Sequence, residues 1–261
     1  MRAIIKKSTR ISRTRLITQA AALAVLSMPF LRLHSICAPV LYCHSCPLSA
    51  MACPLGVLVN FSTFRVFPFI TIGILGLVGT VGGRLVCGWL CPFGLIQDLL
   101  YKIRTRKIGL PSALRYVKYA VLLGLVLAAP FFLPGRPYTF CDYCPAGTLE
   151  SAIPWAIMGV NSGDWLNFSL RVAILAGVLL LAVAASRSWC RVLCPLGAVF
   201  SLFNKYSLFR LSATVGEACR NCGVCREVCS VGIDPIKQVN SGECVRCLDC
   251  TTTGHIKIGI R

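Results

Sequence analysis

Four long apolar runs constrain what this chain can fold into. They cover about Leu16 to Ile36, Val66 to Gly83, Tyr119 to Leu133 and Val172 to Ala185. Each run approaches the roughly 20 residues that an α-helix needs to cross a bilayer. Charged residues make up 14% of the chain, below the roughly 25% of soluble domains, and the mean hydropathy is +0.73. The sequence therefore predicts a mainly α fold, an integral membrane bundle of four transmembrane helices.

The basic residues alternate in density between these runs. Lys and Arg number 6 in residues 1–15, 2 in 32–65, 7 in 84–118, 2 in 134–171 and 10 in 186–261. An excess of Lys and Arg is typical of cytoplasmic segments. We therefore expect a multi-pass protein of the bacterial cytoplasmic membrane with both termini in the cytoplasm. The net charge of +18 is therefore attributed to this topology and not to a nucleic-acid partner. Membrane lipid is the expected surrounding.

A cysteine motif occurs twice in the apolar part of the chain. "CGWLCPFG" begins at Cys87, and "CRVLCPLG" begins 103 residues later at Cys190. Each copy follows an apolar run that is itself preceded by Cys-Pro-x-Gly, at Cys53 and at Cys144. The pattern predicts two helical hairpins of the same orientation, over about 16–110 and 111–210, as in a parallel repeat.

The chain then divides into three parts. Residues 1–15 are predicted to form a basic cytoplasmic N-terminus, and residues 16–210 the four-helix membrane domain. Residues 211–261 are predicted to form a small cytoplasmic ferredoxin-like iron–sulfur domain of α+β type. This last assignment depends on seven cysteines in two runs, "CRNCGVCREVC" and "CVRCLDC", which comprise Cys219, Cys222, Cys225, Cys229, Cys244, Cys247 and Cys250.

The first of these runs has the spacing of a bacterial ferredoxin, in which the fourth cysteine binds the other cluster. The three cysteines of the second run and Cys229 therefore complete one 4Fe-4S cluster. The other three lack a partner, because Gly254 stands where a fourth cysteine is expected. That cluster is either 3Fe-4S or takes its last ligand from His255 or from a membrane-end cysteine. A zinc site is the alternative for the whole set.

Two further cysteine sets are candidate sites in the membrane domain. Proline after the second cysteine of Cys-x3-Cys-Pro disfavours helical geometry at that cysteine, so we expect each helix to end there. The four cysteines can then meet at the inner membrane surface, to hold a cluster or to pack as reduced thiols. They are Cys87, Cys91, Cys190 and Cys194.

The outer loops contain Cys37 and the cysteines of a possible second site. A four-sulfur site would combine Cys43 or Cys46 with Cys53, Cys141 and Cys144. Disulfide bonds are the alternative, because these loops are expected to face an oxidising compartment.

Histidine is scarce, which excludes one kind of electron relay. The chain contains only His34, His44 and His255, so two stacked bis-histidine haems cannot form in the bilayer, and no Cys-x2-Cys-His haem attachment motif occurs. The hydrocarbon core is about 30 Å thick, too far for one efficient electron transfer. A quinone bound between the hairpins is therefore the expected intermediary.

Taken together, "YCHSCPLSAMACPLG", "CGWLCPFG", "FCDYCPAGTLE", "CRVLCPLGA" and the C-terminal cysteine runs resemble the membrane polyferredoxins of the NapH and MauN type, related to NosR and CcoG. The resemblance implies four membrane helices and cytoplasmic 4Fe-4S clusters. It also implies electron transfer between the quinone pool or a cytoplasmic donor and a periplasmic redox partner.

The partners implied are a periplasmic redox enzyme or c-type cytochrome and a further ferredoxin-type subunit. The chain would then be a quinol dehydrogenase component of a respiratory electron-transfer chain. The alternative role is that of a membrane reductase for the assembly of another metalloenzyme.

Overall fold

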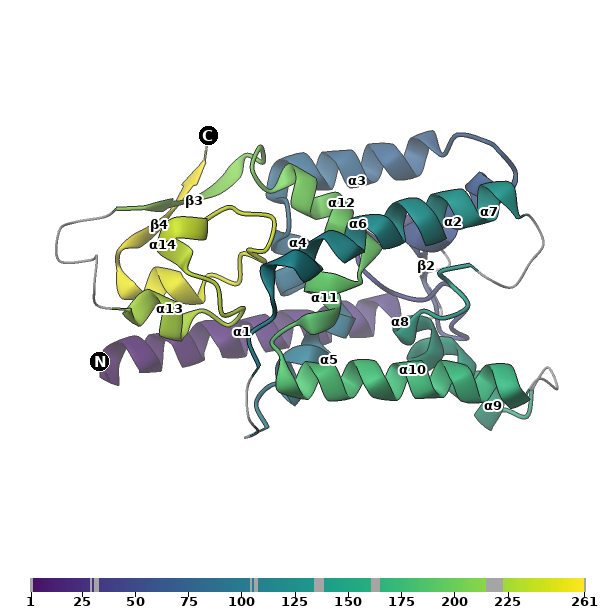
Figure 1. Ribbon diagram of the computed structural model, residues 1–261, viewed down its shortest axis with the longest axis horizontal. Helices are drawn as coiled ribbons and strands as arrows, with labels where there is room; N and C mark the ends of the chain where they lie inside the picture. Colours follow the sequence, from purple (N-terminus) through teal and green to yellow (C-terminus); the bar gives the residue numbers. More distant parts are fainter. Residues whose placement is uncertain are drawn as a thin grey trace.

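The structure is a computed structural model that describes residues 2–28, 30, 33–103, 105, 108–133, 139–160, 165–214 and 223–260. The described chain is mainly helical, as the sequence predicts, and it includes two small two-stranded sheets (Figure 1). The long helices run along the longest axis of the molecule, and the C-terminal region from β3 onward lies at one end of it (Figure 1). We call this region, residues 209–260, the tail.

The elements follow one another in three groups. The first is α1 (Arg2–Leu26), β1 (Leu33–Cys37), β2 (Met51–Ala52), α2 (Pro54–Thr63), α3 (Phe69–Gly82), α4 (Leu85–Trp89) and α5 (Pro92–Leu100). The second is η1 (Ser112–Tyr116), α6 (Val117–Val121), η2 (Leu122–Ala128), α7 (Ala129–Phe132), α8 (Pro145–Gly147), η3 (Thr148–Ala152), α9 (Ile153–Ile157), α10 (Trp165–Ala184), α11 (Ser188–Val192) and α12 (Pro195–Phe203). The tail is β3 (Phe209–Ala213), α13 (Val224–Val228), α14 (Pro235–Gln238), η5 (Asp249–Thr253) and β4 (Ile256–Ile260).

The sequence repeat is also a structural repeat. Helix α3 is followed by the five-residue α4 and the nine-residue α5, and α10 is followed by α11 and α12 of the same two lengths. Helices α5 and α12 both begin with the proline of Cys-x3-Cys-Pro. The buried core lies between the two copies, where the Trp189 indole packs against the rings of Phe93 and Phe140.

Two helices are long and apolar enough to cross a membrane, in the part of the chain that the structure describes. They are Ala113–Phe132, which joins η1 to α7, and Trp165–Ala184. Helix α3 is apolar but shorter, with 14 residues. The prediction of a helix over Leu16 to Ile36 is wrong beyond Leu26, because α1 ends at that residue and Leu33–Cys37 form β1. Four transmembrane helices therefore remain a prediction.

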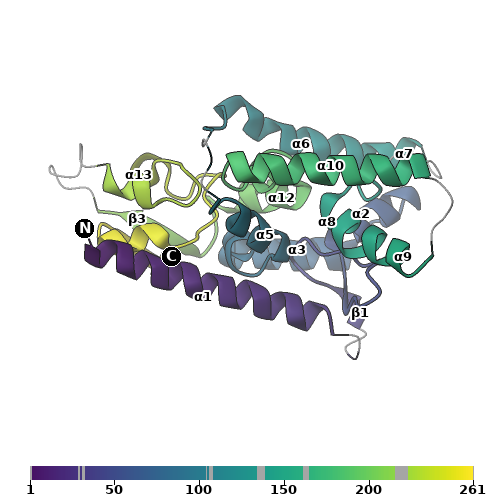
Figure 2. The ribbon, with the colours of Figure 1, turned by 90° about the horizontal axis from the view of Figure 1, so that it is seen from below.

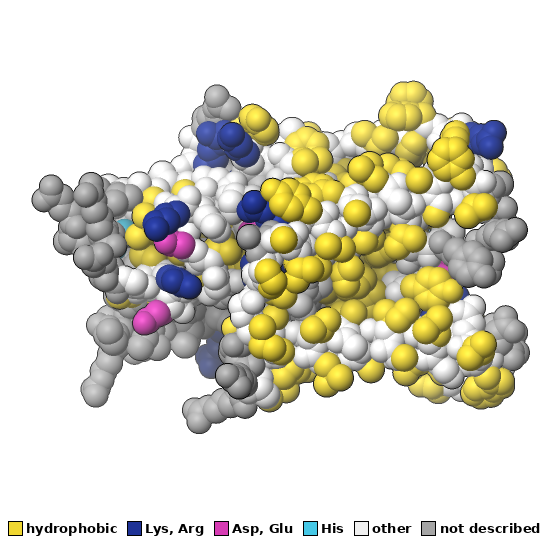
Figure 3. Space-filling view, in the orientation of Figure 1, with side chains coloured by type: hydrophobic (Ala, Val, Ile, Leu, Met, Phe, Trp, Pro, Cys, Tyr) yellow, Lys and Arg dark blue, Asp and Glu magenta, His cyan; other side chains and the backbone are white. Residues whose placement is uncertain are grey.

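The outer surface of the helical part is strongly apolar. Figure 3 shows apolar side chains over α10 and over the helix formed by α6 to α7, whereas Lys and Arg side chains are concentrated nearer the tail. Among the apolar side chains, Leu123, Phe132, Leu166 and Leu180 are 62–86% exposed. A contiguous apolar surface of this kind is unfavourable in water and is suited to lipid or to another protein.

Helix α1 connects the tail to the rest of the molecule. It runs without a break along both parts (Figure 2), across the boundary expected after residue 15. The tail is closed by antiparallel pairing of β3 with β4, from Phe209 opposite Ile260 to Ala213 opposite Ile256. A close backbone contact completes the junction, because a Cβ at Gly88 of α4 would lie 2.4 Å from the carbonyl oxygen of Val245.

This contact predicts that Gly88→Ala weakens the docking of the tail. The added methyl group cannot fit unless the backbone moves, and such overpacking costs about 1–3 kcal/mol. We expect a lower apparent Tm in detergent and faster proteolysis of the tail. The control is Gly76→Ala in α3, where nothing lies within 4 Å of the added Cβ. Equal stability of the two variants would contradict the prediction.

Candidate metal centres

Four Cys-Pro-x-Gly segments have the same local structure. Each cysteine is the extended residue before a helix whose first residue is the proline, with φ between −76° and −68° and ψ between 115° and 126°. The Cys194 sulfur also accepts a hydrogen bond of 3.4 Å from the backbone N–H of Gly197, three residues later. A thiolate is stabilised in this position by the N-terminal end of the helix. The four cysteines are Cys53, Cys91, Cys144 and Cys194.

The outer cysteines line a cavity of about 440 Å³ at the end of the molecule opposite the tail. Cys43, Cys53, Cys141 and Cys144 all face it and influence one another electrostatically. The cavity wall also includes the aromatic rings of Phe140, Trp155 and Phe168. We call these four cysteines the outer set. The structure therefore brings together the residues that the sequence proposes, with Cys43 in place of Cys46.

Two contacts from the second repeat hold the backbone of the loop that contains Cys43 and Ser45. The Glu150 carboxylate accepts a hydrogen bond of 2.7 Å from the backbone N–H of Cys43. The indole N–H of Trp155 donates to the carbonyl oxygen of Ser45, at 2.9 Å. Cys46 is not among the residues that line the cavity, and it interacts with the Tyr42 hydroxyl. The sequence could not show this choice, because both partners lie more than 100 residues away.

Burial keeps the outer thiols protonated. It raises the pKa of Cys43 to about 11 and that of Cys141 to about 12, and neighbouring cysteines add to the shift. Burial also raises the pKa of Glu150 to about 7. Iron binding requires thiolates, so loading of this set would release protons. The six outer cysteines are free thiols in this structure.

The inner cysteines meet in the core between the two repeats. Cys87, Cys91, Cys190 and Cys194 are 3–7% exposed and belong to one buried cluster. The Gln97 amide donates a hydrogen bond of 3.2 Å to the Cys190 sulfur. Each expected helix end is confirmed, although α4 and α11 end two residues before the second cysteine. Cys91 and Cys194 therefore stand directly before α5 and α12, and they do not lie on the same helix as Cys87 and Cys190. We call these four cysteines the inner set.

In the tail, one four-cysteine set is complete. Cys229, Cys244, Cys247 and Cys250 line the same small, enclosed cavity, as the sequence predicts. Its other walls are mainly apolar and include Val231, Ile233 and Val245, together with the Arg246 side chain. Burial raises the pKa of Cys247 to about 12.

The rest of the tail site is only partly described. Cys219 and Cys222 lie outside the described residues, whereas Cys225 is buried and its sulfur donates to the Thr253 hydroxyl at 3.3 Å. The residue after Thr253 is Gly254, with φ +81°. A cysteine would be strained in this left-handed conformation. The side chain of His255 is exposed.

Among the described residues, no three His, Cys, Asp or Glu side chains are arranged to hold a single metal ion. Each cysteine of a 4Fe-4S site binds its own iron. Four cysteines in one set are the donor groups of an iron–sulfur site. His44 and Asp142 also line the cavity of the outer set.

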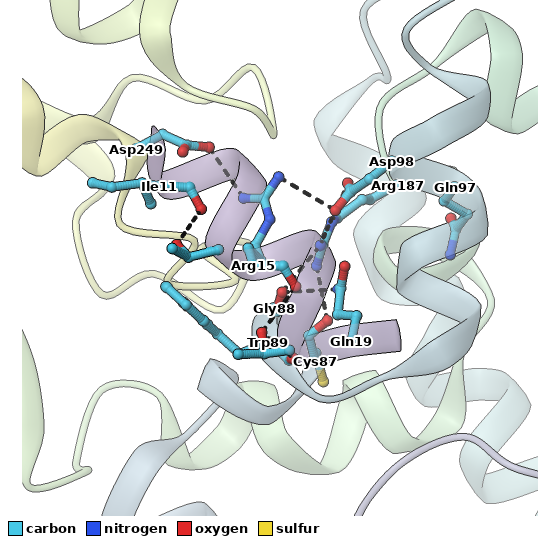
Figure 4. Close-up of polar contacts among 12 residues, drawn as sticks. Ile11, Arg15, Gln19, Cys87, Gly88, Trp89, Gln97, Asp98, Arg187 and Asp249 are labelled. Atoms are coloured by element: carbon cyan, nitrogen blue, oxygen red, sulfur yellow. Dashed lines mark hydrogen bonds and ion pairs between the residues drawn. The ribbon is translucent and has the colours of Figure 1, made fainter. Parts of the chain in front are cut away.

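Sequence reasoning missed the charged residues that join these sites. Figure 4 shows that Arg15 of α1 lies between Asp98 of α5 and Asp249 of the tail, at 3.3 and 3.1 Å. Arg187 also binds Asp98, through Nε and Nη2. Burial alone would raise the pKa of Asp98, but Arg187 and Arg15 outweigh this effect and hold it below its usual value. One carboxylate therefore joins α1 and both repeats.

Removal of this carboxylate is expected to destabilise the protein. Asp98→Asn leaves two buried guanidinium groups without their shared anion, and loss of one partner of a buried ion pair costs about 3–5 kcal/mol. We expect a large fall in the apparent Tm. The matched control is Asp234→Asn, at the N-cap of α14, because asparagine caps a helix as well as aspartate. Similar Tm values for the two variants would show that the network carries little stability.

The outer set generates a second prediction. Cys43→Ser should abolish any iron bound there, whereas Cys46→Ser should leave it unchanged, because only the first side chain faces the cavity. Iron and sulfide analysis of anaerobically purified variants measures this difference. The reverse result would assign the ligand to Cys46.

Comparison with known proteins places the repeat in a family. Residues 64–111 and 166–213 each match the family described as a 4Fe-4S binding domain. Protein MJ0750 of Methanocaldococcus jannaschii is 31% identical over 181 residues, which are 66% of this chain and 68% of that protein. No solved structure matches the chain.

Two further relatives have descriptive names. NirI of Paracoccus denitrificans is 33% identical over 65% of this chain and 24% of its own length. The methylamine utilization ferredoxin-type protein MauN of Methylorubrum extorquens is 35% identical over 58% of this chain. The chain spans about half the length of MauN, at 48%. These matches confirm the resemblance, and the chain belongs to the membrane-associated 4Fe-4S ferredoxin-type family.

Proposed function

We propose that this chain is an integral-membrane iron–sulfur protein that relays electrons between the quinone pool or a cytoplasmic donor and a periplasmic redox partner. One observation carries the proposal. The outer set lines the outer cavity, the inner set belongs to α4, α11 and the starts of α5 and α12, and the third set lies in the tail. Helices α8 and α11 and the elements of the tail follow one another in this order along the long axis (Figure 1). A chain that used cysteines only for packing would not need this order.

The donor sets fit iron–sulfur clusters. Cys229, Cys244, Cys247 and Cys250 would hold one 4Fe-4S cluster, and the outer and inner sets would hold one each. When bound, such clusters accept and release single electrons. The protein contributes mainly apolar surroundings at the inner and tail sets, and helix N-termini at Cys53, Cys91, Cys144 and Cys194 that would stabilise thiolate.

The surface supports a membrane location. Two helices have the length and apolarity of membrane spans, and their outward side chains are strongly exposed. Both chain ends lie at the tail end of the molecule (Figure 1). This placement, together with the distribution of Lys and Arg, supports a cytoplasmic tail and an outer set on the periplasmic side.

The outer cavity is a suitable place for the quinol ring. It is open to the surroundings, and Phe140, Trp155 and Phe168 provide flat apolar surfaces beside the outer set. Oxidation of one quinol there would release two protons and two electrons. The electrons would pass one at a time to the outer set, and from it either to a periplasmic partner or, through the inner set, to the tail. The relatives named above do not favour the alternative role in metalloenzyme assembly.

The proposal is tested with the anaerobically purified full chain in proteoliposomes. We expect repeated turnover of a quinol analogue when a soluble electron acceptor is present. Cys91→Ser and Cys194→Ser should each reduce this turnover at least tenfold while the tail cluster remains visible by EPR. The control is Cys37→Ser, because Cys37 belongs to none of the three sets. Full turnover in the Cys91 and Cys194 variants would show that the inner cysteine motif only ends a helix and takes no part in electron transfer. A single stoichiometric reduction of a metal ion, without turnover, would favour the assembly role.

A further inference from the structure

Two buried arginines occupy equivalent positions in the two repeats. Arg84 lies three residues before Cys87, and Arg187 lies three residues before Cys190. Arg84 is 0% exposed and Arg187 is 1% exposed. Because guanidinium groups are costly to bury, their placement beside the inner set requires an explanation.

The two side chains cross between the repeats. Nη2 of Arg84 donates to the carbonyl oxygen of Cys190 at 2.6 Å, and Nη1 of Arg187 donates to that of Cys87 at 2.9 Å. Gly197 leaves room for the first bond, because a Cβ there would lie 2.7 Å from the Cys190 oxygen. Each repeat thus positions the first inner cysteine of the other.

The two arginines differ in whether a carboxylate neutralises their charge. Arg187 binds the Asp98 carboxylate through two nitrogens. Arg84 has no carboxylate within ion-pair distance among the described residues, and its Nε has no partner there. Its remaining guanidinium bond goes to the carbonyl oxygen of Gly242 in the tail. Among the described residues, no carboxylate thus neutralises Arg84 by direct contact beside the inner set.

Nearby carboxylates do not neutralise the positive charge of Arg84. Arg84 is the strongest charge that acts on the Glu243 carboxylate, but Glu243 forms its ion pairs with Lys118 at 2.9 Å and Arg191 at 3.1 Å. Three cations thus face one anion. Around Asp98, by contrast, Arg15 and Arg187 are balanced by Asp98 and Asp249. Burial raises the pKa of the Cys87 thiol, and Arg84 is the strongest charge that opposes this shift.

We propose that Arg84 is a positioning residue that sets the reduction potential of the inner site, an inference that rests on the proposed cluster at that site. A cluster with four thiolates is an anion, and it gains one further negative charge when it accepts one electron. An uncompensated buried cation stabilises the reduced state more than the oxidised state, because the local dielectric constant is low. Arg84 therefore raises the potential and makes the inner site a better electron acceptor.

The test is a reductive titration of the anaerobically purified full chain with dithionite, followed by low-temperature EPR. The inner signal is defined as the one that Cys91→Ser removes. In Arg84→Gln, we expect the reduced-to-oxidised ratio of this signal at fixed potential to fall at least tenfold, which is 59 mV for a one-electron couple. Glu243→Gln removes a negative charge and should shift the potential in the opposite direction. A purely structural role would not produce shifts of opposite sign.

Two control variants separate the effect of a charge at position 84 from the effect of changing the net charge of the protein. Arg84→Lys retains the cation and should retain most of the potential. Arg65→Gln removes the same charge from the start of the α2–α3 loop, where the guanidinium stacks on Phe131, and should have no effect.

Each outcome decides between the proposals. If Cys91→Ser removes no signal, the inner cluster and the role of Arg84 both fail. If the signal is present but neither Arg84→Gln nor Glu243→Gln shifts it, only the role of Arg84 is overturned. If Arg84→Gln does not accumulate in the membrane, the sign of the shift in Glu243→Gln decides alone, and no upward shift overturns the inference.

Discussion

The Asp98 carboxylate holds both repeats, α1 and, through Arg15, the tail in one network of ion pairs. It binds Arg187 at the start of α11 and Arg15 of α1, and Arg15 continues to Asp249 of the tail (Figure 4). Arg187 adopts a left-handed conformation, with φ 47°, which is unfavourable for a residue with a side chain. The two bonds to Asp98 and the bond to the Cys87 carbonyl compensate for that cost. Without Asp98, the chain would lose the point where both repeats, α1 and the tail are held together.

The sequence predicted the features that depend on local spacing. Proline after Cys91 and Cys194 fixes extended geometry at the cysteine and starts a new helix, so the ends of α4 and α11 could be located closely. The repeat was visible because the same motif recurs after 103 residues. Cys229 could be grouped with Cys244, Cys247 and Cys250 because the ferredoxin spacing itself assigns the fourth ligand to the other run.

Features that depend on distant backbone partners could not be predicted. Arg84 and Arg187 donate to carbonyl groups, and a carbonyl leaves no signature in a sequence. Their shared position before each Cys-x3-Cys motif was the available signal. The preference for Cys43 over Cys46 depends on Glu150 and Trp155 of the other repeat. The path of α1 was also hidden, since its arginines resembled a free cytoplasmic segment, yet Arg15 is buried against the tail.

The two repeats have similar structures, so each could in principle bind the tail, but the chain contains only one tail. The halves differ at the position after the first inner cysteine. In the first half this residue is Gly88, which lets the Val245 carbonyl approach closely. In the second half it is Arg191, which binds Glu243 and the Val231 carbonyl. The tail therefore fits in one orientation, and that orientation places Glu243 between cations on the side of Arg84. The neutral Asp98 network lies on the side of Arg187. The unequal charge at the inner site thus follows from the docking of a single tail on a repeated scaffold.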